Sequence, residues 1–278
     1  MLQPDQVISG RYRVDRMIGG GGSADVYKVE HVRLKSMHAL KVLHDASGPE
    51  VTQALLLEGR VQAMLAHPNI VRVVDILDLG DADALIMDFV DGETLAEWLA
   101  GDGKSSSLID LLGVFVGVIR GVNAAHVRGI IHRDLNPTNI LLSVTGGRVT
   151  AKIADFGRAR LTGESATLVA PPVYRMVGVP RYTSPEQADD PGLADERSDL
   201  FSLGCILYEM ICGAPAFVGS SREEIEHLVQ NGLHEPPTSH VPNLSAPLQR
   251  VVRSLLTTDR NRRLANCKSL FRALELRD

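Results

Sequence analysis

The chain contains one stretch that decides its fold, Ile131-His132-Arg133-Asp134-Leu135-Asn136-Pro137-Thr138-Asn139. It matches the pattern H-R-D-L-x-x-x-N, in which the aspartate can orient a hydroxyl group and the asparagine five residues later can bind Mg²⁺. Five fixed positions would occur by chance in a chain of this length on the order of once in ten thousand. We therefore expect Asp134 and Asn139 to lie in one active site.

The overall composition is typical of a globular protein. The chain has 278 residues, of which 44% are hydrophobic and 23% are charged, and this suits one bilobal domain or two small domains. The formal net charge is −5 and the sequence has no dense basic run. Binding to nucleic acid therefore has no electrostatic support.

We expect no membrane segment in this chain. The most apolar run, from Leu108 to Ile119, contains Asp110 and is too short to cross a bilayer, and the first residues lack the apolar core of a signal peptide. The cysteines, Cys205, Cys212 and Cys267, are scattered and lack the spacing of metal ligands. Buried, reduced thiols and a cytoplasmic location are therefore expected.

The hydrophobic pattern divides the chain into a strand-rich front and a helical back. Before Asp91-Gly92, which interrupts the pattern, the sequence predicts strands at residues 11–18, 24–32, 37–43, 70–79 and 84–89 and a helix at 50–66. Beyond it, helices are expected near 94–100, 107–128, 198–212, 222–230, 246–256 and 267–276, with short strands flanking 139–153. We expect an α+β fold whose parts, 11–90 and 91–278, meet near Val90–Glu93.

A glycine cluster lies between the first two predicted strands, in Ile18-Gly19-Gly20-Gly21-Gly22-Ser23-Ala24-Asp25-Val26. Glycine lets a hairpin backbone approach nucleotide phosphates closely. Taken alone, the cluster fits a glycine-rich turn without a ligand equally well. It departs from G-x-G-x-x-G at Ala24, which is expected to loosen the cover over the phosphates without removing the site.

Lys41 lies in His38-Ala39-Leu40-Lys41-Val42, close to the strand pattern V-A-I-K. A lysine in an apolar strand needs a partner for its charge. The pattern supplies the α- and β-phosphates of ATP and a glutamate on the next helix, for which Glu58 is the best candidate. The alternative is that Lys41 is solvated and Glu58 lies on the helix surface. The catalytic-loop motif at 131–139 argues against this alternative.

The second expected metal ligand is Asp155, in Ala154-Asp155-Phe156-Gly157, 21 residues after Asp134. The oxygen atoms of Asn139 and Asp155 suit Mg²⁺, which keeps water and substrate phosphates in its other positions. D-F-G alone occurs often by chance, whereas D-F-G at this separation after H-R-D does not, so the pair of motifs is strong evidence for this site.

With these motifs, the chain resembles the eukaryotic-like protein kinase family, most closely its bacterial Ser/Thr members, from about Arg11 to Leu276. Further matching segments are Met87-Asp88-Phe89-Val90 (the hinge), Ser184-Pro185-Glu186, Arg197-Ser198-Asp199, and Arg263 as the partner of Glu186. A small-molecule kinase is disfavoured because the 32-residue segment from D-F-G to S-P-E is not the pattern of that class.

The resemblance implies one bilobal kinase domain over 1–278 that transfers the γ-phosphoryl group of ATP with the help of Mg²⁺. In it, Lys41 and Glu58 would position the phosphates, Asp134 would orient the substrate hydroxyl, and Asn139 and Asp155 would hold the metal. The implied nucleotide contacts are Ile18, Gly19, Gly20, Gly21, Gly22, Ser23, Ala24, Val26, Ala39, Lys41, Met87, Asp88, Val90 and Leu141.

Two positions depart from the Ser/Thr kinase pattern. Asn136 replaces a lysine that in those kinases contacts the transferring phosphate and the catalytic aspartate. Val179 replaces a threonine whose hydroxyl usually bonds that lysine and that aspartate. As a catalytic residue, Asn136 would donate a hydrogen bond without a charge, so we expect Asn136→Lys to raise kcat more than it changes the KM for ATP.

The activation segment also departs from the pattern. Arg133 matches the arginine that binds a phosphorylated threonine in family members. The corresponding region here reads Pro171-Pro172-Val173-Tyr174, so conventional autophosphorylation there is not expected, and Glu164 is an alternative partner for Arg133.

Two hypotheses follow from these residues. The first is an active Ser/Thr protein kinase, slow or dependent on a partner. The second is an ATP-binding pseudokinase that acts as a scaffold. Retention of Asp134 together with the ATP and metal residues favours the first, whereas Asn136 and Val179 favour the second.

Overall fold

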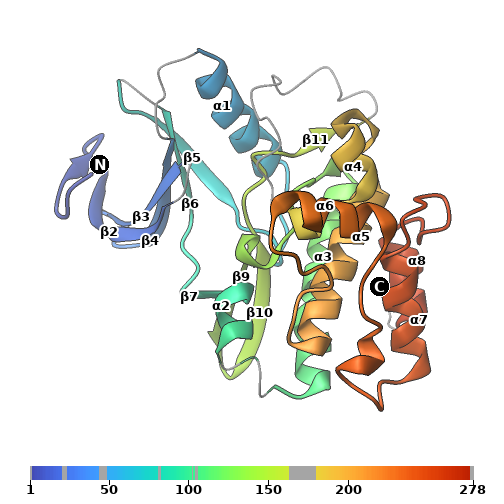
Figure 1. Ribbon diagram of the computed structural model, residues 1–278. Coiled ribbons are helices and arrows are strands. Elements are labelled where there is room, and N and C mark those ends of the chain that lie inside the picture. The colour runs from blue at the N-terminus through green and yellow to red at the C-terminus, as the bar shows by residue number, and fades with distance from the viewer. Residues whose placement is uncertain are drawn as a thin grey trace.

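The structure is a computed structural model that describes residues 2–20, 24–43, 49–80, 83–101, 103, 106–162 and 180–275. A β-sheet with one helix forms the front part, and helices dominate the part beyond residue 95 (Figure 1). The expected α+β class is confirmed.

The front part is built on an antiparallel sheet. In the described residues the sheet has six strands in the order β1-β2-β3-β4-β6-β5. Their bounds are β1 (Val7–Ile8), β2 (Tyr12–Gly20), β3 (Ala24–His31), β4 (Met37–Leu43), β5 (Val73–Asp78) and β6 (Asp83–Asp88). Strand β1 was not expected, because two residues are too few to show an alternating pattern.

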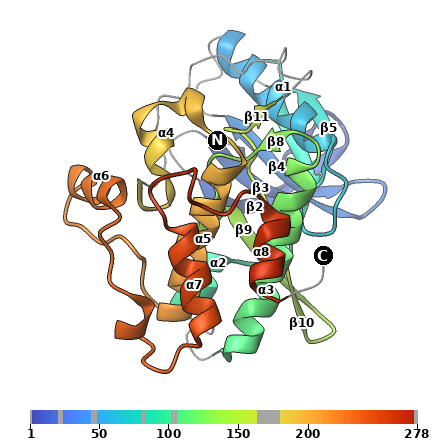
Figure 2. The same cartoon turned by 90° about the vertical axis from the view of Figure 1, so that its right-hand side faces the viewer.

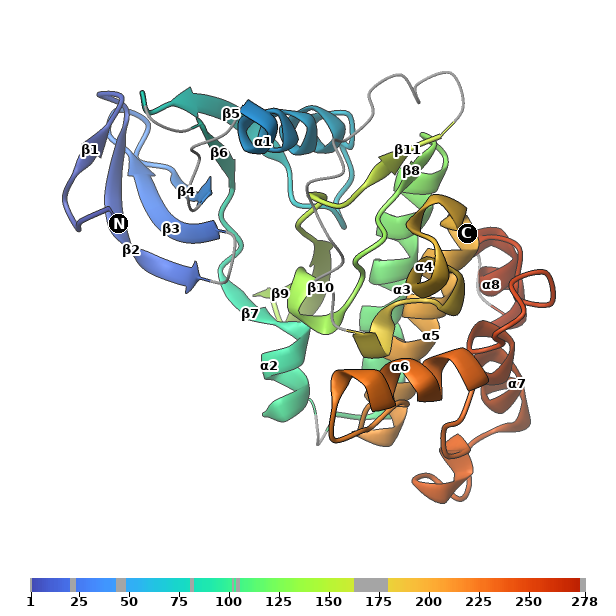
Figure 3. The same ribbon diagram turned by 45° about the horizontal axis from the view of Figure 1, so that its top comes forward.

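Strand β4 lies in the middle of this sheet and has apolar residues on both faces. Leu40 belongs to one buried cluster, while Ala39 and Leu43 belong to another on the opposite face. Because side chains alternate along a strand, Lys41 points to the same face as Ala39 and Leu43. Helix α1 (Pro49–Ala63) packs against β5 and β6 (Figure 3).

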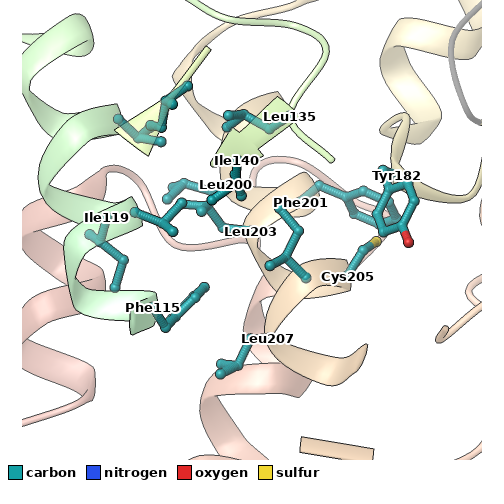
Figure 4. Close-up of a cluster of buried hydrophobic side chains, with 14 of the residues drawn as sticks. Phe115, Ile119, Leu135, Ile140, Tyr182, Leu200, Phe201, Leu203, Cys205 and Leu207 are labelled. Atoms are coloured by element: carbon teal, nitrogen blue, oxygen red, sulfur yellow. The ribbon is translucent and has the colours of Figure 1, made fainter. Parts of the chain in front are cut away.

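The back part contains helices α2 (Leu95–Ala100), α3 (Leu108–His126), α4 (Pro185–Asp189), α5 (Glu196–Cys212), α6 (Arg222–Asn231), α7 (Ala246–Leu255) and α8 (Cys267–Ala273). Helix α3 packs against α5 and α8, and Figure 2 shows α3 beside α8. Figure 4 shows Phe115 and Ile119 of α3 close to Leu200 and Leu203 of α5. Leu135, from the predicted catalytic loop, belongs to the same buried cluster.

Helix α3 is longer than the apolar run noted in the sequence. In the part of the chain that the structure describes, it is the one helix long and apolar enough to cross a membrane by length and composition. Many of its apolar residues, including Val114, Phe115 and Val118, are buried, and the helix packs against α5, α8 and the strand at Arg148–Ile153. Helix α3 is therefore a core helix.

Short strands shape the region between the two parts. Strands β10 (Arg148–Ile153), β9 (Ile140–Thr145) and β7 (Gly92–Thr94) form a sheet in that order, and β8 (Ile130–Ile131) pairs with β11 (Arg160–Leu161). Strand β7 was not expected, since Gly92 suggested an interruption. A Cβ atom at Gly92 would lie 1.7 Å from the carbonyl oxygen of Leu142, so glycine here permits the close approach of β7 to β9.

The loop at 132–139 is attached to α5 through the buried carboxylate of Asp199. This carboxylate accepts hydrogen bonds from the backbone N–H groups of His132 at 2.9 Å and Arg133 at 2.8 Å. It also bonds the His126 ring at 2.8 Å. Burial alone would lower the pKa of His126, but the hydrogen bonds and charges of Asp199 and Cys267 together outweigh burial and raise that pKa to about 10.

The raised pKa of His126 predicts a pH-dependent stability. Because the folded pKa of about 10 lies above the ordinary value of 6.5, the stabilisation is fully present below pH 6.5 and is lost as the pH rises toward 10. Urea unfolding of the wild type and of His126→Gln should show a difference in unfolding free energy that shrinks by up to about 1.4 kcal/mol per pH unit in this range. Parallel pH curves for the two proteins would contradict the charged pair.

A second buried ion pair joins α4 to the segment before α8. Arg263 donates to Glu186 through Nη1–Oε1 at 2.7 Å and Nη2–Oε2 at 3.1 Å. Ser198 also donates to Oε1 of Glu186 at 2.8 Å. Both charged side chains are buried, so removal of either one would leave an uncompensated charge in the interior.

We expect Glu186→Gln to lower the free energy of unfolding by about 3–5 kcal/mol, because Arg263 then stays buried without a counter-charge. Glu226→Gln is the matched control: Glu226 pairs with Arg222 on the exposed surface of α6 and should contribute less than about 1 kcal/mol. Urea unfolding of both variants measures the difference. Equal losses in the two variants would argue against the structural role of the buried pair.

Candidate active site

Lys41 lies at the centre of a charge cluster in which Lys41 and Glu58 are buried and the Asp155 side chain is 45% exposed. Its Nζ donates to Oε1 of Glu58 on α1 at 2.7 Å and to Oδ1 of Asp155 at 3.0 Å. Burial alone would lower the pKa of Lys41, but the two carboxylates outweigh it and raise that pKa. Burial would likewise raise the pKa of Asp155, and the Lys41 ammonium reverses this and lowers it. Lys41 and Asp155 are therefore both charged at neutral pH.

Asp155 and Asn139 are held next to each other by the backbone. The N–H of Ala154 donates to the carbonyl oxygen of Asn139 at 2.9 Å, and Asp155 has a left-handed backbone with a φ of 61°. The amide nitrogen of Asn139 donates to the carbonyl oxygen of Asp134 at 2.9 Å. That bond leaves the side-chain oxygen of Asn139 as the atom available to a cation.

The donor set at Asn139 and Asp155 fits Mg²⁺ better than other common metals. Both residues offer oxygen atoms, and magnesium sites in proteins often use one or two such groups with substrate phosphates. Among the described residues, no cluster of three or more His, Cys, Asp or Glu could hold a metal ion. A zinc-type centre therefore has no support in that part of the chain.

Asp134 is half-buried and contacts two side chains through the same oxygen. Its Oδ2 lies 3.5 Å from Nδ2 of Asn139 and 3.6 Å from Nε of Arg158. Burial raises the pKa of Asp134, and the charge of Arg158 opposes this shift. The sequence analysis did not identify Arg158. Its position directly after D-F-G was the one available signal, and that position alone does not reveal the contact.

Asn136 is turned into its own loop. Its Nδ2 donates to the carbonyl oxygen of Asp134 at 3.0 Å, and its Oδ1 accepts from the N–H of Thr138 at 2.9 Å and from the Thr138 hydroxyl at 2.5 Å. Only 3% of the residue is exposed. These bonds cap the short 3₁₀ turn Pro137–Asn139. The expected hydrogen bond from Asn136 to the transferring phosphate stays a prediction.

Six of the fourteen expected nucleotide contacts lie in or around one apolar cluster. Ala39 and Met87 are buried in it, and they face each other across β4 and β6. The cluster is edged by the partly buried residues Ala24, Val26, Val90 and Leu141. Leu141 comes from β9, whereas the others come from the front part. The front part and the back part of the chain therefore both contribute residues to this apolar cluster.

The remaining expected nucleotide contacts that the structure describes do not belong to this apolar cluster. Ile18 is exposed, and Gly19 and Gly20 end β2. Asp88 bonds Arg72 through both its side chain, at 3.2 Å, and its N–H, at 2.9 Å. The glycine-loop tip (Gly21, Gly22, Ser23), Glu164, residues 171–174 and Val179 lie outside the described residues.

Arg133 has an unusual environment for a charged side chain. Its backbone has a φ of 68°, and its carbonyl oxygen accepts from Gln187 at 3.0 Å. Within the described part of the chain, its Nε is buried and has no hydrogen-bond partner. A buried donor of this kind needs an acceptor, and the expected acceptors lie in the undescribed segment 163–179.

Comparison with known proteins gives the same family as the motifs. A model of the protein kinase domain matches residues 12–273. The probable serine/threonine-protein kinase PknB of Bifidobacterium longum is 34% identical over 273 residues, which cover 94% of this chain and 39% of that protein. The serine/threonine-protein kinase pkn2 of Myxococcus xanthus is 35% identical over 283 residues, which cover 99% of this chain and 33% of that protein.

PknB of Mycobacterium tuberculosis is 34% identical over 253 residues, with 88% of this chain and 39% of that protein covered. The chain thus spans 33% to 39% of the length of these three relatives. A protein kinase domain implies the use of ATP. These relatives are bacterial serine/threonine-protein kinases, to which the chain is similar, and the family match over nearly the whole chain establishes that the chain belongs to the protein kinase family.

Proposed function

We propose that this chain transfers the γ-phosphoryl group of ATP to serine or threonine hydroxyls of a protein substrate. The observation that carries the proposal is the connected arrangement of Lys41, Asp155, Asn139 and Asp134. Lys41 bonds Asp155, the backbone of Asn139 bonds the residue before Asp155, and the amide of Asn139 bonds Asp134. A scaffold that only binds nucleotide has no need for a carboxylate placed like that of Asp134.

Each residue has a separate role in this proposal. Lys41 would keep its bond to Glu58 and turn its remaining donors to the α- and β-phosphates. Asn139 and Asp155 would hold Mg²⁺, which offsets the charge of the triphosphate. Asp134 would orient the substrate hydroxyl and accept its proton. Among the described residues, Oδ1 of Asp134 accepts no hydrogen bond from the protein, so it is the oxygen that suits this task.

The alternative is a pseudokinase that binds ATP without transferring phosphate. It is favoured by one observation: Asn136 is uncharged and its amide is bonded inside the loop. The position where Ser/Thr kinases place a lysine therefore offers no cation to the transferring group.

Asp134→Asn separates the two functions. The amide cannot accept the hydroxyl proton, so we expect phosphate transfer to fall by about 10²-fold or more, while Mg·ATP still protects the protein against thermal unfolding. Transfer from radiolabelled ATP to dephosphorylated casein measures the first effect. Asp110→Asn, an exchange of the same type at the exposed start of α3, is the control. Equal background signal from the wild type and Asp134→Asn would contradict kinase activity.

Asn136→Lys tests the role of the loop amide. The added charge should raise kcat by roughly tenfold and change the KM for ATP less, because the charge would act on the transferring group. The same change removes the cap on Pro137–Asn139, so the protein should lose about 0.5–2 kcal/mol of stability. Steady-state kinetics and urea unfolding measure both effects. A lower kcat at saturating ATP would show that the capping role of Asn136 dominates.

A further inference from the structure

The residue after the D-F-G motif, Arg158, is held beside the predicted catalytic loop by contacts on both of its sides. Before it, the buried Phe156 packs on the ring of His132, with ring centroids 4.6 Å apart. After it, Arg160 of β11 pairs with Ile131 of β8, next to the loop. A backbone bond from Ala159 to Phe156 at 2.9 Å closes the turn between these two points. The position of Arg158 therefore follows from the backbone.

The side chain of Arg158 approaches only one side of the Asp134 carboxylate. Its Nε lies 3.6 Å from Oδ2, the oxygen that also faces the Asn139 amide. The side chains of Arg158 and Asp134 are 25% and 21% exposed, so the pair lies at the boundary between the interior and solvent. The other oxygen of Asp134 stays available to a hydroxyl group.

No other lysine or arginine side chain in the described residues comes within 4 Å of the Asp134 carboxylate. Lys41 is shared by Glu58 and Asp155, and Arg133 contacts Asp199 through its backbone. Asn136 is neutral, and its amide is bonded within the loop. Phosphoryl transfer develops negative charge that a nearby cation stabilises. Among the lysine and arginine side chains of the described residues, Arg158 is the one that lies beside Asp134.

We propose that the guanidinium of Arg158 supplies the positive charge at the transferring phosphoryl group, in place of a charge from position 136. The proposal rests on the proposed kinase function. In the transfer step, the substrate oxygen bonds to the γ-phosphorus, the bond from the γ-phosphorus to the β,γ-bridging oxygen breaks, the hydroxyl proton passes to Asp134, and ADP leaves. Arg158 keeps Asp134 oriented through Oδ2 and directs its remaining N–H donors to the phosphoryl oxygens.

The opposite role is the main competitor. The same contact would inhibit the enzyme if Arg158 kept Asp134 away from the substrate. The two roles predict opposite changes when the charge is removed, so one set of variants separates them.

The experiment compares three variants of the full chain with the wild type. Arg158→Gln removes the charge and keeps a polar side chain, and Arg158→Lys keeps the charge. Arg160→Gln is the matched control, because Arg160 lies on the same segment but points to the carbonyl oxygen of Gly192. Steady-state kcat and KM for Mg·ATP are measured with dephosphorylated casein as the acceptor, and Asp134→Asn defines the background.

We expect Arg158→Gln to lower kcat by about 10²-fold while the KM for ATP changes far less, because the lost charge acts on the transferring group. Arg158→Lys should retain kcat within roughly tenfold of the wild type, and Arg160→Gln should leave it nearly unchanged. In addition, Asn136→Lys should raise kcat more in the Arg158→Gln background than in the wild type, since the two cations would serve one purpose.

Three outcomes would overturn the inference while the kinase function stands: an unchanged kcat in Arg158→Gln, an increased kcat in Arg158→Gln, or an equal loss in Arg158→Gln and Arg160→Gln. The second outcome would identify the contact as inhibitory. A wild type no more active than Asp134→Asn would overturn the proposed function and, with it, the role of Arg158. Thermal unfolding of each variant shows whether the loss of activity reflects loss of the fold.

Discussion

The buried carboxylate of Asp199 is the interaction on which the geometry of the site depends. It accepts the N–H groups of His132 and Arg133 and bonds the ring of His126, so one side chain of α5 fixes both the end of α3 and the start of the loop. A charged group can stay in the interior when several donors replace its water. Arg133 has a left-handed backbone, which costs conformational energy and persists only where the surroundings enforce it. Asp134 follows directly, so its place is set by α5.

The charges of the site form two paired groups, one at the front sheet and one at this loop. Lys41 lies between Glu58 and Asp155, and Asp134 lies beside Arg158. Pairing makes the burial of Lys41 and Glu58 tolerable, because an isolated charge in the interior would be neutralised by a pKa shift. Lys41 is bonded to two carboxylates, so it can release one of them to meet a phosphate and remain paired with the other. The arrangement is therefore stable before a nucleotide binds and compatible with one afterwards.

Much of this structure could be predicted from the sequence, and the rest could not for identifiable reasons. The central strands and long helices have a periodic pattern. A lysine in an apolar strand needs a partner, and the kinase pattern pointed to Glu58 for that role. Strand β7 was missed because Gly92 is typical of an interruption, whereas here it permits a close backbone approach. The bonds of Asn136 and the contact of Arg158 depend on side-chain direction. Neither periodicity nor motif spacing carries that information.

A cation at position 158, in place of one at position 136, would be held in place by different parts of the structure. A lysine at position 136 would belong to the loop that Asp199 anchors through buried hydrogen bonds. Arg158 instead depends on the packing of Phe156 against His132 and on the two-residue pairing of β11 with β8. A pairing this short contributes little stability of its own, and local openings of low free energy occur preferentially in such elements. If Arg158 is the cation of the transfer step, activity depends on the placement of the segment after D-F-G more directly than it would with a lysine in the loop.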